Sequence, residues 1–259
     1  MDSLFSRAQR ISSDECISLT KAWITEIQRL FLEEFYASSI SKGWILIGGA
    51  NLKFLYNQKR HTKDIDFAGN KETFEQVNDV IEALKVIEHT LEKRAGYPVS
   101  IKPSEGKTAV KVFVSCPEIG GVTSFDIEFT NFEVILPPEK AQIGQTLVLG
   151  SKLKEMKVNK ILSLVLRKKL AHRDIFDLFI NPEPIDPSLL DRYLHRYKKK
   201  KIDLKKKISL IKRNIHEFNL RLLEVLKEDL GLEETKRYIS SSKDTSLLER
   251  VLREIEAAI

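Results

Sequence analysis

The sequence has few cysteines and no long apolar segment, and both absences exclude classes of protein. Its two cysteines, Cys16 and Cys116, lie far apart in dissimilar surroundings, so we expect reduced thiols rather than a disulfide or a zinc site. No apolar run approaches the roughly 20 residues that a membrane helix needs. Residues 1–10 lack the basic and then apolar layout of a signal peptide, so we expect a cytoplasmic protein with no membrane partner.

The composition is that of a folded protein with an uneven distribution of charge. The 259 residues are 42% hydrophobic and 31% charged, which predicts one large or two modest globular domains. Residues 1–150 carry 17 Lys and Arg against 20 Asp and Glu, whereas residues 151–259 carry 26 against 17. The basic second part favours contact with a polyanion.

Apolar periodicity predicts a mixed first part and a helical second part. Helices are expected at 12–36, 50–56, 71–93, 153–170 and 173–180, with three or more beyond, and strands at 44–47, 64–67, 98–102, 109–116, 122–130, 133–137 and 145–151. The three prolines of "INPEPIDPS" are the clearest linker-like punctuation. We therefore predict an α+β domain over residues 1–181 and a basic helical bundle over residues 182–259.

Two predicted strands carry paired acids. Because side chains alternate along a strand, Asp64 and Asp66 share one face, and Asp126 and Glu128 do the same on a later strand. If the two strands are neighbours, these carboxylates converge, and a hard divalent cation would relieve their repulsion. The pattern predicts a Mg²⁺ site.

A pair of glycines precedes the first acidic strand. Gly48 and Gly49 end one predicted strand and begin a helix, which leaves backbone N–H groups available to a phosphate. A phosphate cradle beside a magnesium site is typical of nucleotidyl transfer, in which metal ions hold a triphosphate and stabilise the leaving pyrophosphate.

These motifs resemble those of the AbiEii/AbiGii toxin family of the nucleotidyltransferase superfamily. The family's Gly-Gly-Thr-Ala-Leu and Arg-x-Ser-x-Asp-hydrophobic-Asp-Phe motifs are similar to residues 48–52 and 60–67, with Thr62 in place of the serine. Its helical lysine and Arg-Asp-x-x-Asp-Leu box are similar to Lys160 and residues 173–178. The likeness extends over roughly residues 40–180.

The sequence departs from the family pattern in two places. Ala50-Asn51 stands where the family has Thr-Ala, so a phosphate-binding hydroxyl is missing. Ser124 stands where the family has a lysine two residues before its third acid, so a cation is missing there.

The resemblance implies a nucleotidyltransferase-fold sheet domain and a role for each matched residue. Asp64 and Asp66 would hold Mg²⁺ or Mn²⁺, with Asp126 as third acid at the metal ion and as an aid to deprotonation of the acceptor hydroxyl. Glu128 is the alternate third acid that alternation cannot exclude. Gly48 and Gly49 would contact the β- and γ-phosphates of an NTP, and Lys160 would neutralise triphosphate charge. Asp177 would line the site with Asp174 as alternate, since we expect only one of them to point fully inward.

The basic tract of residues 192–213 is a candidate for RNA contact. Its candidate residues are Arg196, Lys198, Lys199, Lys200, Lys201, Lys205, Lys206 and Lys207, with Tyr193 and Tyr197 interleaved. A solvated face of the helical bundle is the alternative interpretation of the same tract.

The resulting functional hypothesis is Mg²⁺-dependent transfer of an NMP from an NTP to a hydroxyl. The resemblance implies a toxin of a toxin–antitoxin pair, with RNA or tRNA as acceptor and a cognate antitoxin protein as partner. One alternative is the same chemistry on a protein or small-molecule hydroxyl. Another is a degenerate fold that binds RNA or protein without catalysis.

Overall fold

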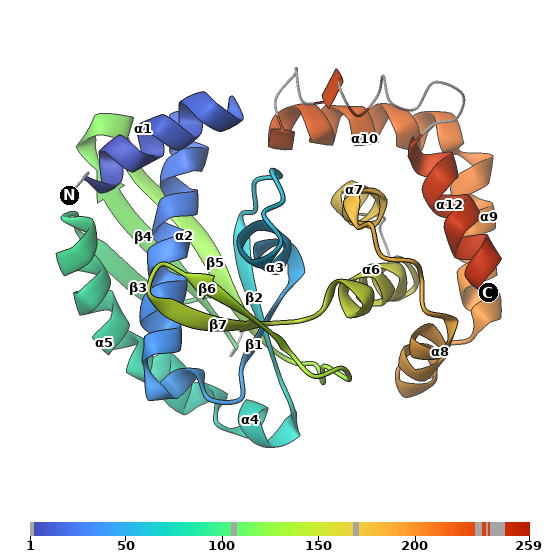
Figure 1. Ribbon diagram of the computed structural model, residues 1–259, viewed down its shortest axis with the longest axis horizontal. Helices are drawn as coiled ribbons and strands as arrows, with labels where there is room; N and C mark the ends of the chain where they lie inside the picture. The colour runs from blue at the N-terminus through green and yellow to red at the C-terminus, as the bar shows by residue number, and fades with distance from the viewer. Residues whose placement is uncertain (1–2, 105–107, 168–170, 231–234, 237, 239–246) are drawn as a thin grey trace. The chain divides into compact units, whose positions relative to one another are not determined.

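The computed structural model describes residues 3–104, 108–167, 171–230, 235–236, 238 and 247–259. The chain divides into two compact units, Met1–Lys152 and Leu153–Ile259. The first contains a seven-stranded mixed sheet and the second is helical (Figure 1). The predicted α+β class is therefore confirmed. Residues 153–180, which the sequence groups with the sheet, lie in the helical unit, where α6 (Leu153–Leu166) and α7 (His172–Ile180) contact helices nearer the C-terminus.

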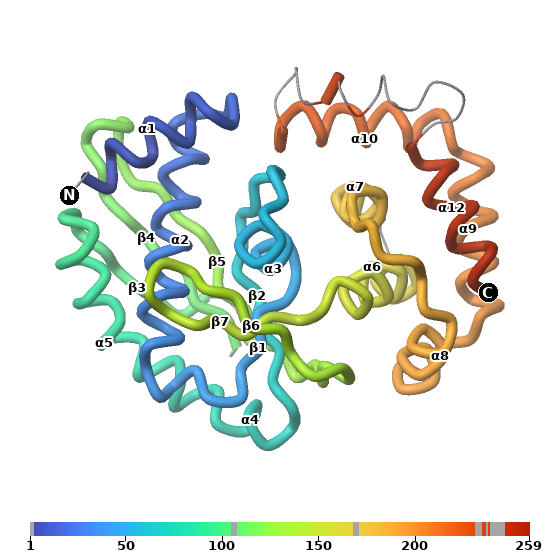
Figure 2. Tube along the Cα trace, viewed as in Figure 1, coloured from blue at the N-terminus to red at the C-terminus, as the bar shows by residue number. Residues whose placement is uncertain are grey.

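The first unit contains both helices and strands. Its elements are α1 (Leu4–Glu15), α2 (Leu19–Ala37), η1 (Ser39–Ser41), β1 (Ile45–Ile47), α3 (Gly48–Leu55), β2 (Asp64–Gly69), α4 (Lys71–Glu75), α5 (Val77–Ala95), β3 (Val99–Pro103), β4 (Ala109–Cys116), η2 (Pro117–Ile119), β5 (Gly121–Asn131), β6 (Glu139–Ile143) and β7 (Thr146–Gly150). The strand order is β3-β4-β5-β2-β1-β7-β6. Strand β2 runs parallel to β5 and antiparallel to β1. The course of the chain through these elements can be followed in Figure 2.

One face of the sheet is covered by α2 and α5 (Figure 1). Alternate residues of β2 and β5 on this face are fully buried and aromatic or aliphatic, namely Ile65, Phe67, Ile127 and Phe129. Phe35 of α2 packs on Phe67 with ring centroids 4.5 Å apart, and Phe67 stacks on Phe129 at 5.3 Å. This aromatic core fixes which side chains of β2 and β5 point the other way.

Several boundaries differ from the sequence-based expectation. The predicted helix at 12–36 is two helices, because Cys16 adopts a left-handed conformation with φ 53° and ends α1. The N-cap of α2 is Ser18, whose side chain accepts a hydrogen bond from the Lys21 amide at 3.3 Å. Residues 133–137 form no strand, and two prolines at 137–138 cannot donate ladder hydrogen bonds there.

The second unit is built from amphipathic helices. Those described are α6 (Leu153–Leu166), α7 (His172–Ile180), α8 (Pro187–Arg196), α9 (Lys201–Arg213), α10 (Ile215–Leu230) and α12 (Leu247–Ala258). Their buried stripes form a core that includes Ile161, Tyr193, Leu204 and Leu252, each fully buried. Among the described helices, none is long and apolar enough to cross a membrane.

Candidate active site

The four predicted acids lie on one face of two adjacent parallel strands. Asp64 is in register with Asp126, and Asp66 with Glu128. Partners in register point to the same side of a sheet, and the opposite side is filled by the aromatic core. The expectation that the two acidic strands are neighbours is confirmed.

The carboxylates form a suitable donor set without forming a closed cluster. Asp64 and Glu128 are exposed, while Asp66 and Asp126 are half-buried. Within the described ranges, no group of three or more His, Cys, Asp or Glu side chains converges closely enough to hold a metal ion. Mg²⁺ commonly takes only one or two protein carboxylates and completes its shell with water and phosphates, so Asp64 and Asp66 fit it in type and placement.

Asp126 already has a cationic partner. Lys111 of β4 is in register with Asp126, and its Nζ lies 3.4 Å from Asp126 Oδ1. The local motif around Asp126 gives no sign of this lysine, because Lys111 belongs to a different strand from the acid. A cation therefore does lie beside Asp126, although position 124 holds a serine.

The Gly48 backbone and the Asp66 carboxylate are in close contact. Gly48 has φ +67°, and a Cβ at this position would overlap with Asp66 Oδ2. Glycine is thus required at position 48 for two reasons. It adopts the left-handed backbone conformation, and it leaves the space that the Asp66 carboxylate occupies. The bend and the acidic strand form one local structure.

Gly49 is enclosed by the loop that leads into β2. A Cβ on Gly49 would lie 2.8 Å from both Arg60 Nη2 and Thr62 Oγ1. Arg60 also donates to the His61 carbonyl at 3.1 Å, and Thr62 donates to the Asp64 carbonyl at 3.1 Å. Arg60 and Thr62 thus support the start of α3 and the backbone of Asp64, and both side chains are buried.

Helix α3 begins directly at the two glycines. Its N-cap is Ile47, an apolar residue that cannot accept hydrogen bonds from the first-turn amides through its side chain. Such amides, at the positive end of the helix dipole, are suited to an anionic oxygen.

Asn51 has a structural role in the same helix. Its side chain is fully buried and its Nδ2 donates to the Ser151 carbonyl at 2.7 Å, which ties α3 to the end of β7. Tyr56 donates to the same carbonyl at 3.1 Å. The asparagine that departs from the family pattern therefore points into the fold.

Lys160 lies at the centre of a buried ionic cluster in the second unit. Its Nζ is 2.8 Å from Asp174 Oδ1 and 2.8 Å from Asp177 Oδ2. Arg167 bonds the other oxygen of Asp174 at 2.8 Å. The expectation that only one aspartate points inward is wrong, because positions three apart share a helix face.

Arg173 connects two helices of the second unit. Its guanidinium makes a bidentate ion pair with Asp229 of α10, at 2.6 and 3.0 Å, and Asp229 is only 1% exposed. The neighbouring His172 is half-buried, and burial, followed by the charge of Arg221, lowers its pKa. Arg173 therefore links α7 to α10 through this ion pair.

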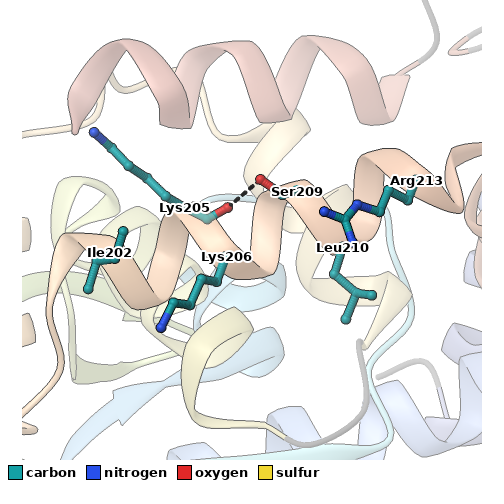
Figure 3. A pocket seen from close by; sticks show the side chains of 6 residues that line it. All are labelled: Ile202, Lys205, Lys206, Ser209, Leu210 and Arg213. Atoms are coloured by element: carbon teal, nitrogen blue, oxygen red, sulfur yellow. Dashed lines mark hydrogen bonds between the residues drawn. The ribbon is translucent and has the colours of Figure 1, made fainter.

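The basic tract lies on α8, α9 and the turn between them. Lys205, Lys206 and Arg213 are exposed on α9 and line a hollow with Ile202 and Leu210 (Figure 3). Several members of the tract have partners within the unit: Lys201 is 3.1 Å from Asp191, Lys207 donates to the Arg167 carbonyl at 3.3 Å, and Lys212 is 2.6 Å from Glu256.

The two tyrosines of the tract differ in accessibility. Tyr193 is fully buried and bonds Glu155, so its ring is not available for stacking on a base. Tyr197 is half-buried. Any RNA contact by this surface depends on its lysines and arginines.

Comparisons with known proteins agree with the fold. A search of curated proteins gives no match. MenT4, a nucleotidyltransferase toxin from Mycobacterium tuberculosis H37Rv, is similar in structure with TM-score 0.57 and 18% identity, covering 71% of this chain and 68% of that one. JHP933 from Helicobacter pylori matches 93% of this chain and 91% of its own with 15% identity, but its TM-score of 0.47 adds no support.

The family profile is the decisive comparison. It matches residues 30–258, nearly the whole chain, and is described as the nucleotidyl transferase AbiEii toxin of type IV toxin–antitoxin systems. The matched range includes both the acidic strands and the Lys160 cluster. The chain therefore belongs to the AbiEii family of nucleotidyltransferase toxins.

Proposed function

We propose that this enzyme transfers an NMP from an NTP to a hydroxyl of RNA, with Mg²⁺ or Mn²⁺ held by Asp64 and Asp66 and joined by Asp126 as the third acid. The observation that carries the proposal is the register of Asp64 with Asp126, next to an Asp66 carboxylate packed on Gly48. Acids and a glycine bend in this arrangement suit a metal ion and a triphosphate side by side. When bound, the metal ion would stabilise charge on the triphosphate and on the leaving pyrophosphate.

The chain's own residues would bind the nucleotide and move one proton. The amides at Gly48 and Gly49 would donate to the β- and γ-phosphates. The acceptor oxygen would form a bond to the α-phosphorus while the bond from the α-phosphorus to the bridging oxygen breaks, releasing pyrophosphate. Asp126 would accept the proton of the acceptor hydroxyl, with Glu128 as the alternate base.

Lys160 is proposed as a further cation for the triphosphate, on the strength of the family motif. Within the second unit its ammonium is held by Asp174 and Asp177. In this proposal the two aspartates orient the lysine and do not themselves meet the substrate.

RNA is the acceptor that the basic tract favours, and the family resemblance makes tRNA 3′ ends the leading candidate. The exposed cations of α9 would meet phosphates without reading sequence. Arg196, Lys198 and Lys200 are also exposed and extend the same tract. A cognate antitoxin encoded separately is the proposed protein partner.

The test is incubation of the enzyme with total RNA, Mg²⁺ and each α-labelled NTP in turn. Label in the RNA fraction, absent when Mg²⁺ is chelated, is the expected result. Label in protein or in small molecules would show that the acceptor is a hydroxyl of that fraction and not of RNA. RNA binding with no label in any fraction would favour a non-catalytic binding module and contradict the proposed reaction.

A further inference from the structure

The ion pair between Lys111 and Asp126 lies at the edge of the proposed metal site. A row of side chains in register crosses four strands on this face, in the order Lys102, Lys111, Asp126 and Asp64. The side chains of Lys111 and Asp126 are 38% and 41% exposed, so water screens their attraction.

The two lysines in this row have different partners. Lys111 meets the carboxylate at 3.4 Å, whereas Lys102 lies over the Phe113 ring with its Nζ 5.7 Å from the centroid. Both are on the same face, one strand apart. Lys102 therefore offers a matched cation that does not touch the acids of the row.

The charge of Lys111 has two opposite effects on the acids. It reduces the repulsion between the adjacent Asp64 and Asp126 while the site holds no other cation. It also occupies one oxygen of Asp126 and opposes the approach of a second positive charge. A divalent ion that recruits Asp126 has to displace this lysine or share the carboxylate with it.

We propose that Lys111 is a positioning residue that competes with the divalent metal ion for Asp126 before NTP binds. This inference rests on the proposed function, because it assumes a metal ion at Asp64 and Asp66. In the nucleotide-free enzyme Asp126 is paired with Lys111, and the metal ion is held mainly by the two acids of β2. The lysine thereby weakens metal binding in the absence of substrate.

The test measures Mn²⁺ affinity of the nucleotide-free protein by electron paramagnetic resonance. Lys111→Met is expected to bind Mn²⁺ about two- to fivefold more tightly than the wild type, the factor that corresponds to an exposed ion pair. Lys111→Arg keeps the charge and is expected to match the wild type. Lys102→Met is the matched control and is expected to change the affinity by less than Lys111→Met.

A double-variant cycle assigns the effect to Asp126. In an Asp126→Asn background, Lys111→Met is expected to give no gain in Mn²⁺ affinity, because the contested carboxylate is gone. Three results would overturn the inference and leave the proposed function standing. They are an unchanged Mn²⁺ affinity in Lys111→Met, an equal gain in Lys102→Met, and a gain in Lys111→Met that persists in the Asp126→Asn background. Absence of any Mn²⁺ binding that depends on Asp66 would overturn the inference and the proposed metal site together.

Discussion

The carboxylate of Asp66 rests against the α-carbon of Gly48, in space that any side chain at position 48 would fill. The contact joins the two motifs that stand 18 positions apart in the sequence, the glycine pair and the paired aspartates. It fixes the second acid of β2 beside the first turn of α3. The proposed metal and phosphate sites are adjacent for this reason.

Gly48→Ala should destabilise the first unit more than glycine replacement at an open position. Alanine at φ +67° carries strain of about 1–2 kcal/mol, and overlap with Asp66 adds roughly 1–3 kcal/mol. Gly120→Ala is the control, since Gly120 has φ +84° and a Cβ added there would meet nothing within 4 Å. Urea unfolding should show the larger loss in Gly48→Ala, and equal losses would contradict the close contact.

Lys160→Met should destabilise the second unit strongly. It would leave Asp174 and Asp177, 3% and 0% exposed in their side chains, without their shared ammonium, at a cost of about 3 kcal/mol. Lys212→Met breaks an exposed ion pair with Glu256 and should cost less than about 1 kcal/mol. Comparable losses in the free energy of unfolding for the two variants would argue against a buried cluster.

The stability of the second unit should fall as the pH drops below about 6.5, the usual pKa of histidine. Burial lowers the folded-state pKa of His172, so the unfolded chain takes up the proton first and unfolding is favoured in the window between the two pKa values. His172 faces the ring of Phe218 at 5.9 Å and the charge of Arg221.

His172→Gln should therefore flatten the dependence of stability on pH in that window, as measured by thermal melting at a series of pH values. A wild-type slope in His172→Gln would show that another group is responsible.

Alternation along single strands was enough to predict the acidic face. Period two placed Asp64 with Asp66 and Asp126 with Glu128, and the observed register of β2 and β5 confirms their adjacency. The glycine bend was also predictable, because a phosphate-binding turn has a local signature. The contact of Gly48 with Asp66 was not, since it depends on how β1 and β2 pair.

Other features depend on pairings that a single segment does not encode. Lys111 lies 15 positions before its partner Asp126, and the two side chains come together only because β4 pairs with β5. Strand β6 (Glu139–Ile143) was missed because it is a mostly exposed edge strand without apolar alternation. The inward position of Asp174, by contrast, was available from its spacing of three from Asp177.

NMP transfer by acid variants of β2 tests the central claim most directly. Asp64→Asn and Asp66→Asn keep side-chain volume and remove the charge that a metal ion requires, so each should lower incorporation of labelled NMP at least about 100-fold. Glu82→Gln, at an exposed position of α5, should retain wild-type incorporation and melting temperature. Wild-type incorporation in a folded Asp66→Asn variant would contradict the account.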